Sequence, residues 1–396
     1  MAAPLSVSHS LRNMKQANEG EARPRSTTPT VVHCLRMTAE SPVSPYDAVL
    51  LVSFGGPEGM NDVMPFLENV LSGRNVPRER MLDVARHYEL FGGESPINEE
   101  NRKLIAALER ELETKGPHLP VYFGNRNWHP LLPDTIRRMR DDGVKNALAF
   151  VTSAYSSYSS CRQYLENIAD AQKLVGDGAP NIEKLRAFYN HPLFIEANVA
   201  NVRAALEQIP EARRFQTQII FTAHSIPESM ARNCNYEAQF QEASRLVFEG
   251  VAAGASSASP SSNGETTITR NYKPGSYKLV FQSRSGSPSQ PWLGPDVCDQ
   301  LRELHSSGSR DVVVSPIGFV SDHMEIVYDL DTEAMALCRQ LGLNMVRAST
   351  ASTHPAFVRM IHELILERIE PGREKRFLGA IEPAKDTCTS DCCMIR

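Results

Sequence analysis

The chain has 396 residues, of which 41% are hydrophobic and 22% are charged. This is the balance of a soluble globular protein, and the length is sufficient for two domains. The formal net charge of −5 leaves no basic footprint, so we predict that nucleic acid is not a partner. No stretch approaches the roughly 18 uninterrupted apolar residues of a membrane-spanning helix, which excludes a span but leaves a peripheral membrane contact open. Composition leaves the oligomeric state open as well.

Residues 1–45 are rich in Ser, Thr and Pro and show no hydrophobic periodicity, which predicts a disordered N-terminal extension. An organelle transit peptide would also carry arginine and serine, but Glu19, Glu21 and Glu40 argue against one. A second hypothesis is that translation starts at Met37, shortly before the fold. Native peptides from upstream of Met37 would refute it.

A short apolar run at residues 48–54 ends at Gly55-Gly56-Pro57, as a buried parallel strand does where it enters a loop. Further short apolar runs alternate with helical patterns, which predicts a parallel sheet with helices on both faces. The alternation occurs twice, so we predict an α/β fold of two Rossmann-like halves. The predicted strands are residues 48–54, 121–124, 147–152, 218–222, 277–282 and 312–316, and the helical patterns include residues 98–115, 131–142, 164–174, 192–208 and 238–252.

The same pattern gives the domain boundaries. An N-terminal Rossmann-like domain is predicted at residues 46–182 and a C-terminal one at residues 183–354. A Gly-, Ser-, Asn- and Pro-rich segment at 253–276 is expected to interrupt the second domain as a flexible surface insertion. A helix at 355–370 is expected to complete the first domain, and a tail at 371–396 follows it.

Ligands of open parallel sheets bind beyond the carboxyl ends of the strands. The loops that follow Phe54, Thr152, Thr222, Gln282 and Pro316 therefore form the expected binding edge. The conspicuous motifs of the chain fall in these loops, which predicts a single active cleft.

In residues 221–227, a strand ends in His224 before a helix start. Imidazole both titrates near neutral pH and binds iron, which makes His224 a candidate catalytic residue or metal ligand. An ordinary structural histidine is the alternative, and the sequence leaves it open.

In residues 316–329, a strand again ends at a loop, and a helix is predicted to begin near Asp322, which suits a cap. Glu325, Asp329 and Glu333 are four residues apart, so their carboxylates are expected on one helix face. They are either a solvated acidic face or a ladder of oxygen ligands for a hydrated divalent cation.

Two further loops are weaker signals. Trp292 lies in the Pro/Gly-rich segment 291–296, where it is either a buried anchor or a flat aromatic wall for a flat ligand. The Gly92-Gly93 pair in residues 86–98 allows the backbone to approach a ligand closely.

The chain has eight cysteines, and such a count in a long chain without a signal peptide predicts a reducing compartment, here the cytoplasm. Three tail cysteines, Cys388, Cys392 and Cys393, together with one from the body give four thiolates, enough for an iron–sulfur cluster or structural zinc. The scattered cysteines are expected to be small core residues.

Together these motifs resemble the ferrochelatase family, particularly its actinobacterial-type members, over nearly all of residues 46–370. The segments that carry the resemblance are residues 223–227, 282–284 with 291–296, 316–329, 51–57, 92–98 and 123–128. The resemblance implies a chelatase-like fold of two Rossmann-like domains, each a parallel four-stranded sheet flanked by helices. It also implies insertion of Fe²⁺ into protoporphyrin IX or coproporphyrin III, with release of two protons, in haem biosynthesis.

The resemblance implies that His224 and Glu325 face each other across the cleft at the porphyrin centre. Asp329 and Glu333 match an acidic run that leads iron or protons along the helix. The implied porphyrin-binding residues are Phe54, Arg74, Tyr88, Ser95 and Trp292.

Two positions depart from the family pattern. Phe54 stands where some members have Tyr, so phenolate ligation of product iron is unavailable there. His87 occupies a position that is Arg in some relatives, which puts propionate recognition by that residue in doubt.

By the same resemblance, Cys161 matches the body cysteine that joins tail cysteines around a [2Fe–2S] cluster in some members, here Cys388, Cys392 and Cys393. The adjacent Cys-Cys pair departs from the more spread animal spacing. Zinc or free thiols are the alternatives.

The chemistry requires two pyrrole protons to leave, and a planar ring hides its nitrogen lone pairs from an entering ion. A cleft that bends the ring exposes them at a strain cost supplied by binding the rest of the macrocycle. His224 is either the general base or the nitrogen ligand that hands over iron, and Glu325 either accepts protons or binds iron from the opposite side. The sequence leaves both assignments open.

Three other functions compete with this one. A dinucleotide oxidoreductase would need a G-x-G-x-x-G fingerprint, which the glycines at 55, 56 and 59 do not give. A haem carrier or sensor would use His224 as an axial ligand and would not need the acidic helix face. A chelatase for another tetrapyrrole would load cobalt or nickel.

Overall fold

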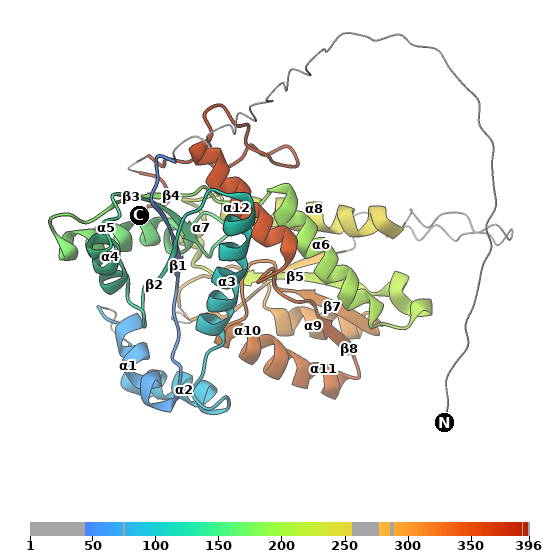
Figure 1. Cartoon of the computed structure of the whole chain (residues 1–396). Coiled ribbons are helices and arrows are strands. Elements are labelled where there is room, and N and C mark those ends of the chain that lie inside the picture. The colour runs from blue at the N-terminus through green and yellow to red at the C-terminus, as the bar shows by residue number, and fades with distance from the viewer. Residues whose placement is uncertain (1–43, 74–75, 256–276, 286–288, 390, 395–396) are drawn as a thin grey trace, which may run out of the picture. The chain divides into compact units, whose positions relative to one another are not determined.

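The computed structural model describes residues 44–73, 76–255, 277–285, 289–389 and 391–394. The predicted N-terminal extension, apart from its last two residues, lies outside this part of the chain, as do Arg74 and residues 256–276 of the predicted insertion. Residues 44–396 form one compact unit, and Figure 1 labels most of its helices and strands.

A parallel four-stranded sheet forms the first half, in the order β2-β1-β3-β4. All six residues of the central strand β1 are buried because helices cover both faces of the sheet. Val49 and Leu51 pack on the side of α3, whereas Leu50 and Val52 pack on the side of α4 and α5. The elements of this half are β1 (Ala48–Ser53), α1 (Met60–Val70), α2 (Arg78–Glu89), α3 (Ile97–Lys115), β2 (Val121–Asn125), α4 (Leu132–Asp141), β3 (Asn146–Val151), the π-helical turn η1 (Tyr158–Arg162), α5 (Gln163–Val175) and β4 (Asn181–Lys184).

The second half repeats this plan with the order β6-β5-β7-β8, again with every neighbouring pair parallel. Two parallel four-stranded sheets flanked by helices confirm the predicted fold class. The elements are α6 (Pro192–Glu207), the 3₁₀ turn η2 (Glu211–Gln216), β5 (Gln218–His224), α7 (Glu228–Ala231), α8 (Tyr236–Ala255), β6 (Tyr277–Gln282), α9 (Val297–Ser306), β7 (Asp311–Ser315), α10 (Met324–Tyr328), the π-helical turn η3 (Asp329–Ala334), α11 (Met335–Leu341), β8 (Asn344–Arg347) and α12 (Pro355–Ile369).

The two halves share one apolar core. Leu51 of β1, Phe221 of β5 and Phe357 of α12 belong to the same buried cluster. Helix α12 packs against α3 of the first half and α6 of the second, as Figure 1 shows. The two sheets are therefore held at fixed positions relative to each other, which a site built from both of them requires.

Strands β4 and β8, which each form one of the two edges of their sheet, are absent from the strands predicted from the sequence. Each is four residues long and carries polar residues, because an edge strand is covered less completely than a central one. Strand β4 also crosses the predicted boundary between residues 182 and 183, so the first sheet continues to Lys184.

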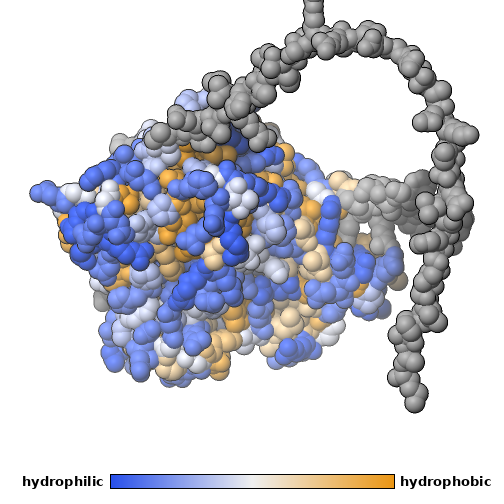
Figure 2. Space-filling model, viewed as in Figure 1, coloured by the Kyte–Doolittle hydropathy of each residue, from blue (hydrophilic) through white to orange (hydrophobic). Residues whose placement is uncertain are grey.

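The face of the molecule seen in Figure 2 is mixed in polarity, with hydrophilic residues and apolar groups between them. Within the described residues, no helix combines the length and the apolar character that crossing a membrane requires.

Candidate active site and cysteine site

His224 is the last residue of β5, at the carboxyl edge of the second sheet where the sequence places it. Its Nδ1 contacts the carbonyl oxygen of Ser225. A carbonyl can only accept a hydrogen bond, so Nδ1 carries the proton and Nε2 is the nitrogen left for chemistry. Nε2 lies 3.4 Å from Oε1 of Glu325, and these two side chains are 31% and 41% exposed. A ligand that enters the cleft can therefore reach both.

Glu325 lies in the first turn of α10, between two imidazoles. His224 contacts one carboxylate oxygen, and Nε2 of His323 lies 3.2 Å from the other. His323 belongs to the motif at residues 316–329 but was not predicted as a site residue. Its position two residues before Glu325 is the only sequence signal that could have found it.

His224 and Glu325 each shift the pKa of the other. Burial lowers the pKa of His224, but the charge and hydrogen bond of Glu325, with the Ser225 carbonyl and Asp329, raise it above its ordinary value overall. Burial raises the pKa of Glu325, but His224 and then His323 hold it well below its usual range. Before substrate binds, the pair is therefore an imidazolium beside a carboxylate at neutral pH.

The acidic run that follows Glu325 differs from its predicted geometry. The helix predicted to begin near Asp322 is present and begins at Met324, but it is not a regular α-helix throughout, because α10 gives way to the π-helical η3 at Asp329. Asp322 does not cap α10. Its carboxylate instead accepts hydrogen bonds from Arg347 and Thr350.

Asp329 still lies beside the central pair. The side chain of Gln282 donates to the Glu325 carbonyl at 3.1 Å and to the Asp329 carboxylate at 3.4 Å. The pKa of Asp329 is raised to about 6, chiefly by burial. The charges of Glu325 and Glu333 add to this shift, and a hydrogen bond from Ser283 partly opposes it. Glu333 is exposed, so the run leads from the centre toward solvent.

Two residues that were not predicted as site residues support this centre. The Tyr236 hydroxyl donates to the His224 carbonyl at 3.0 Å, and Thr222 donates to Gln282 at 2.7 Å. Both act on residues at the strand ends rather than on a ligand. They were missed because residues far apart in sequence meet only when β5, β6 and α8 pack together.

Four of the residues predicted to bind porphyrin are described, and the contacts of the structure link Tyr88 and Trp292 to the central pair. The Tyr88 ring is buried beside Phe66, and burial followed by the charge of Glu325 raises its pKa. Phe54 is partly exposed and packs edge-on against Phe66. Trp292 pairs with Pro227, three residues after His224. Arg74 lies outside the described residues.

Ser95 lines a cavity of about 600 Å³ that also reaches Met324 and Val327, which flank Glu325. The cavity therefore reaches α10, the helix that carries Glu325. On the same side, His87 of α2 stacks on Tyr328 of α10, with ring centroids 3.7 Å apart and planes 9° apart. Helices α2 and α10 are thus in contact across this part of the cleft.

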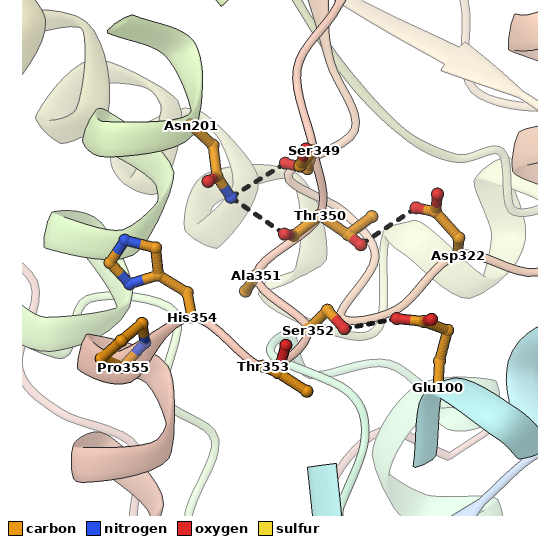
Figure 3. Close-up of a pocket in the computed structure, with 10 residues that line it drawn as sticks. All are labelled: Glu100, Asn201, Asp322, Ser349, Thr350, Ala351, Ser352, Thr353, His354 and Pro355. Atoms are coloured by element: carbon orange, nitrogen blue, oxygen red, sulfur yellow. Dashed lines mark hydrogen bonds between the residues drawn. The ribbon is translucent and has the colours of Figure 1, made fainter. Parts of the chain in front are cut away.

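A second cavity, of about 430 Å³, lies where α3, α6 and the loop after β8 meet (Figure 3). Its polar groups bind one another, since Asn201 donates to the carbonyls of Ser349 and Thr350, and Ser352 donates to Glu100. Thr350 also holds Asp322, which fixes the loop three residues before Glu325. This junction positions the site.

Residues 46–369 match the model of the family described as ferrochelatase. The chain belongs to the ferrochelatase family. A ferrochelatase of Rhodopirellula baltica is 53% identical over 355 residues, which cover 89% of this chain and 95% of that protein. A coproporphyrin III ferrochelatase of Streptomyces griseus is 45% identical over 370 residues, covering 89% and 94% respectively. The structure of the sirohydrochlorin chelatase SirB from Bacillus subtilis with cobalt covers 82% of this chain at 12% identity with a TM-score of 0.44, too distant to bear on the assignment.

Membership of the ferrochelatase family confirms the function predicted from the sequence. The chain is an enzyme that inserts ferrous iron into a porphyrin in haem biosynthesis. The reaction makes it a metal chelatase, which is a lyase, rather than a haem carrier or a dinucleotide oxidoreductase.

This ferrochelatase also brings its predicted cluster cysteines together. Cys161 of η1 is hydrogen-bonded to Cys388, and Cys388 is hydrogen-bonded to Cys392. The Sγ atoms of Cys392 and Cys393 lie 3.6 Å apart. The hydrogen bond to Cys388 and burial raise the pKa of Cys161, whereas that of Cys388 is lowered by the same bond. A fifth thiol, Cys234, acts electrostatically on Cys393 and is only partly buried, unlike the core residue that was predicted.

The cysteine site can be tested against a [2Fe–2S] cluster. Metal–thiolate bonds of about 2.3 Å in tetrahedral geometry set two sulfurs on one metal about 3.7 Å apart. The Cys392–Cys393 separation agrees with that value. Within the described part of the chain, however, no three His, Cys, Asp or Glu side chains are yet arranged to hold a metal ion. The donors therefore fit in type and in neighbourhood, and binding would need them to draw closer.

Proposed function

We propose that this ferrochelatase carries out its reaction at His224 and Glu325. The observation that supports this most strongly is the 3.4 Å approach of His224 Nε2 to Glu325 Oε1 at the carboxyl edge of a parallel sheet. The porphyrin would lie in the cleft among Phe54, Tyr88 and Trp292, and its edge would extend toward the cavity lined by Ser95.

The two residues take different roles in this proposal. Glu325 stays ionised because two imidazoles stabilise its charge, so it suits the approach of Fe²⁺. The positive charge of iron would cancel the field that raises the pKa of His224. The imidazole would then release its proton to Asp329, and Nε2 would be free to accept the two pyrrole protons in turn, each passed on to Asp329 before the next is taken.

Asp329 and Glu333 are proposed to move protons or iron between this pair and solvent. A carboxyl whose pKa is about 6 both takes up and releases protons near neutral pH, which is what a relay requires. The exposed Glu333 would be its outer end.

Coproporphyrin III is the proposed substrate. Relatives from Streptomyces, Nocardia and Frankia named coproporphyrin III ferrochelatase are 45% to 46% identical to this chain. The 53% identical relative from Rhodopirellula carries the plain name ferrochelatase, so the choice needs a direct test.

An anoxic metallation assay that offers Fe²⁺ with each porphyrin separately makes that test. We expect faster turnover with coproporphyrin III, followed by the change in the porphyrin absorption spectrum. Faster turnover with protoporphyrin IX would contradict the substrate proposal but not the reaction. Replacement of Glu325 by glutamine should lower turnover with whichever porphyrin is used.

We also propose a [2Fe–2S] cluster held by Cys161, Cys388, Cys392 and Cys393. When bound, the cluster would add four metal–thiolate bonds between the tail and η1. We expect the isolated protein to show visible iron–sulfur absorption and acid-labile sulfide, and Cys161→Ser to lose both. Zinc in place of iron, or no metal at all, would contradict this proposal. The cytoplasmic location and a peripheral membrane contact stay predictions.

A further inference from the structure

The segment between α12 and the tail cysteines has no helix or strand within its described residues, yet its backbone is paired with the body of the protein. Arg186 donates to the Arg376 carbonyl at 2.9 Å. The Leu378 amide donates to the Asn190 carbonyl at 2.9 Å. The Tyr189 hydroxyl donates to the Glu382 carbonyl, also at 2.9 Å.

Asn190 and Glu242 complete this contact. The Asn190 side chain donates to the Ile381 carbonyl at 2.8 Å, and the Ala380 amide donates to the Glu242 carboxylate at 3.1 Å. Tyr189, Asn190 and Glu242 are buried, so these bonds are shielded from water. Hydrogen bonds from Arg245 and from the Ala380 amide hold the pKa of Glu242 below its ordinary value. The Glu242 carboxylate therefore stays charged and accepts these hydrogen bonds strongly.

Gly379 shows how closely the segment fits. Its φ of +83° is in the left-handed region that side chains other than glycine rarely adopt. A Cβ built there would collide with the carboxylate of Glu242. Gly372, in the same tail, has a similar φ of +80° but open space around a built Cβ. Alanine at either position would strain the backbone, but only alanine at Gly379 would also disrupt docking. Comparing the two variants therefore separates the effect of strain from the effect of lost docking.

We propose that Tyr189, Asn190 and Glu242 form a docking site that holds residues 378–382 whether or not metal is bound, and thereby positions the tail thiols beside Cys161. None of the contacts that carry this inference involves a sulfur atom. The inference deepens the cluster proposal above, and these three residues would be positioning residues for it.

Docking shortens the undocked stretch of chain that leads to the tail cysteines. Cys388 lies 19 positions after Ile369 but only six positions after Glu382. Because the cost of bringing chain ends together grows with length, anchoring at residue 382 would raise the local concentration of tail thiols at Cys161 roughly sixfold.

Limited trypsin digestion tests docking without any metal readout, since the tail contains Arg373, Lys375, Arg376 and Lys385. We expect the tail of Gly379→Ala to be cleaved at least tenfold faster than that of the wild type. The substitution should break about two of the hydrogen bonds that dock the segment, so the segment would open to the protease more often. Gly372→Ala should be cleaved at Lys385 at the wild-type rate. Asn190→Ala, which introduces no backbone strain, should behave like Gly379→Ala.

Cys161→Ser decides whether docking depends on metal. Protection of its tail at the wild-type level is the expected result. Cleavage as fast as in Gly379→Ala would show that metal holds the tail and would overturn the inference. A protected tail in Gly379→Ala and Asn190→Ala would overturn it equally.

Iron and acid-labile sulfide per chain, measured after anaerobic reconstitution, link docking to the cluster. We expect several-fold lower loading in Gly379→Ala than in Gly372→Ala. Equal loading would overturn the positioning role. If the wild type binds neither iron nor sulfide, the cluster proposal fails, and proteolysis still decides the docking.

Discussion

Replacing His224 with alanine is expected to lower iron insertion by about 10²–10⁴-fold, which is the usual contribution of a positioned general base. The substitution removes Nε2, the only nitrogen of the ring that is not committed to the Ser225 carbonyl. It also leaves the Glu325 carboxylate with His323 as its single imidazole partner. The anoxic metallation assay gives the rate.

His305→Ala is the matched control, since His305 is an exposed histidine in the last turn of α9. Its rate should equal that of the wild type. Unchanged melting temperatures in both variants would show that the fold is intact. A His224→Ala enzyme with more than a tenth of wild-type turnover would remove His224 from the chemistry.

Replacing Arg186 with methionine is expected to lower the free energy of unfolding by about 3–5 kcal/mol, as breaking a buried ion pair generally does. Arg186 binds both oxygens of Glu367 at 2.7 and 2.9 Å, and the two side chains are 1% and 2% exposed. Methionine fills similar space but leaves the Glu367 charge buried without its partner. Urea unfolding curves measure the change.

Arg359→Met is the control for this prediction, because Arg359 lies on the same helix α12 but pairs with Glu196 in solvent. Those side chains are 40% and 56% exposed, so the loss should be about 0–1 kcal/mol. If the two variants lost the same free energy of unfolding, burial would not be the reason that the Arg186–Glu367 ion pair stabilises the fold.

The tail connects these two results. Arg186 also donates to the Arg376 carbonyl, so the buried pair lies directly below the docked segment. Arg186→Met should therefore loosen the tail as well as the fold. Gly379→Ala should loosen the tail alone, and comparing the two separates tail docking from global stability.

The sequence by itself determined the chain's α/β class, the strand that ends at His224 and the family. Central strands such as Ala48–Ser53 are apolar on both faces, and this leaves a signal that can be read without a structure. Each motif at a strand end consists of consecutive residues, so it could be recognised in the sequence without knowledge of the rest of the fold.

Only the tertiary structure decided which groups meet. His323 and Tyr236 join the centre through packing, and a π-helical turn at Asp329 replaces the regular helix that four-residue spacing predicted. The docking of residues 378–382 on Tyr189, Asn190 and Glu242 likewise has no local signature. Short polar edge strands, π-helical turns and contacts between distant residues depend on the surrounding fold rather than on local periodicity, which is the physical reason the sequence could not supply them.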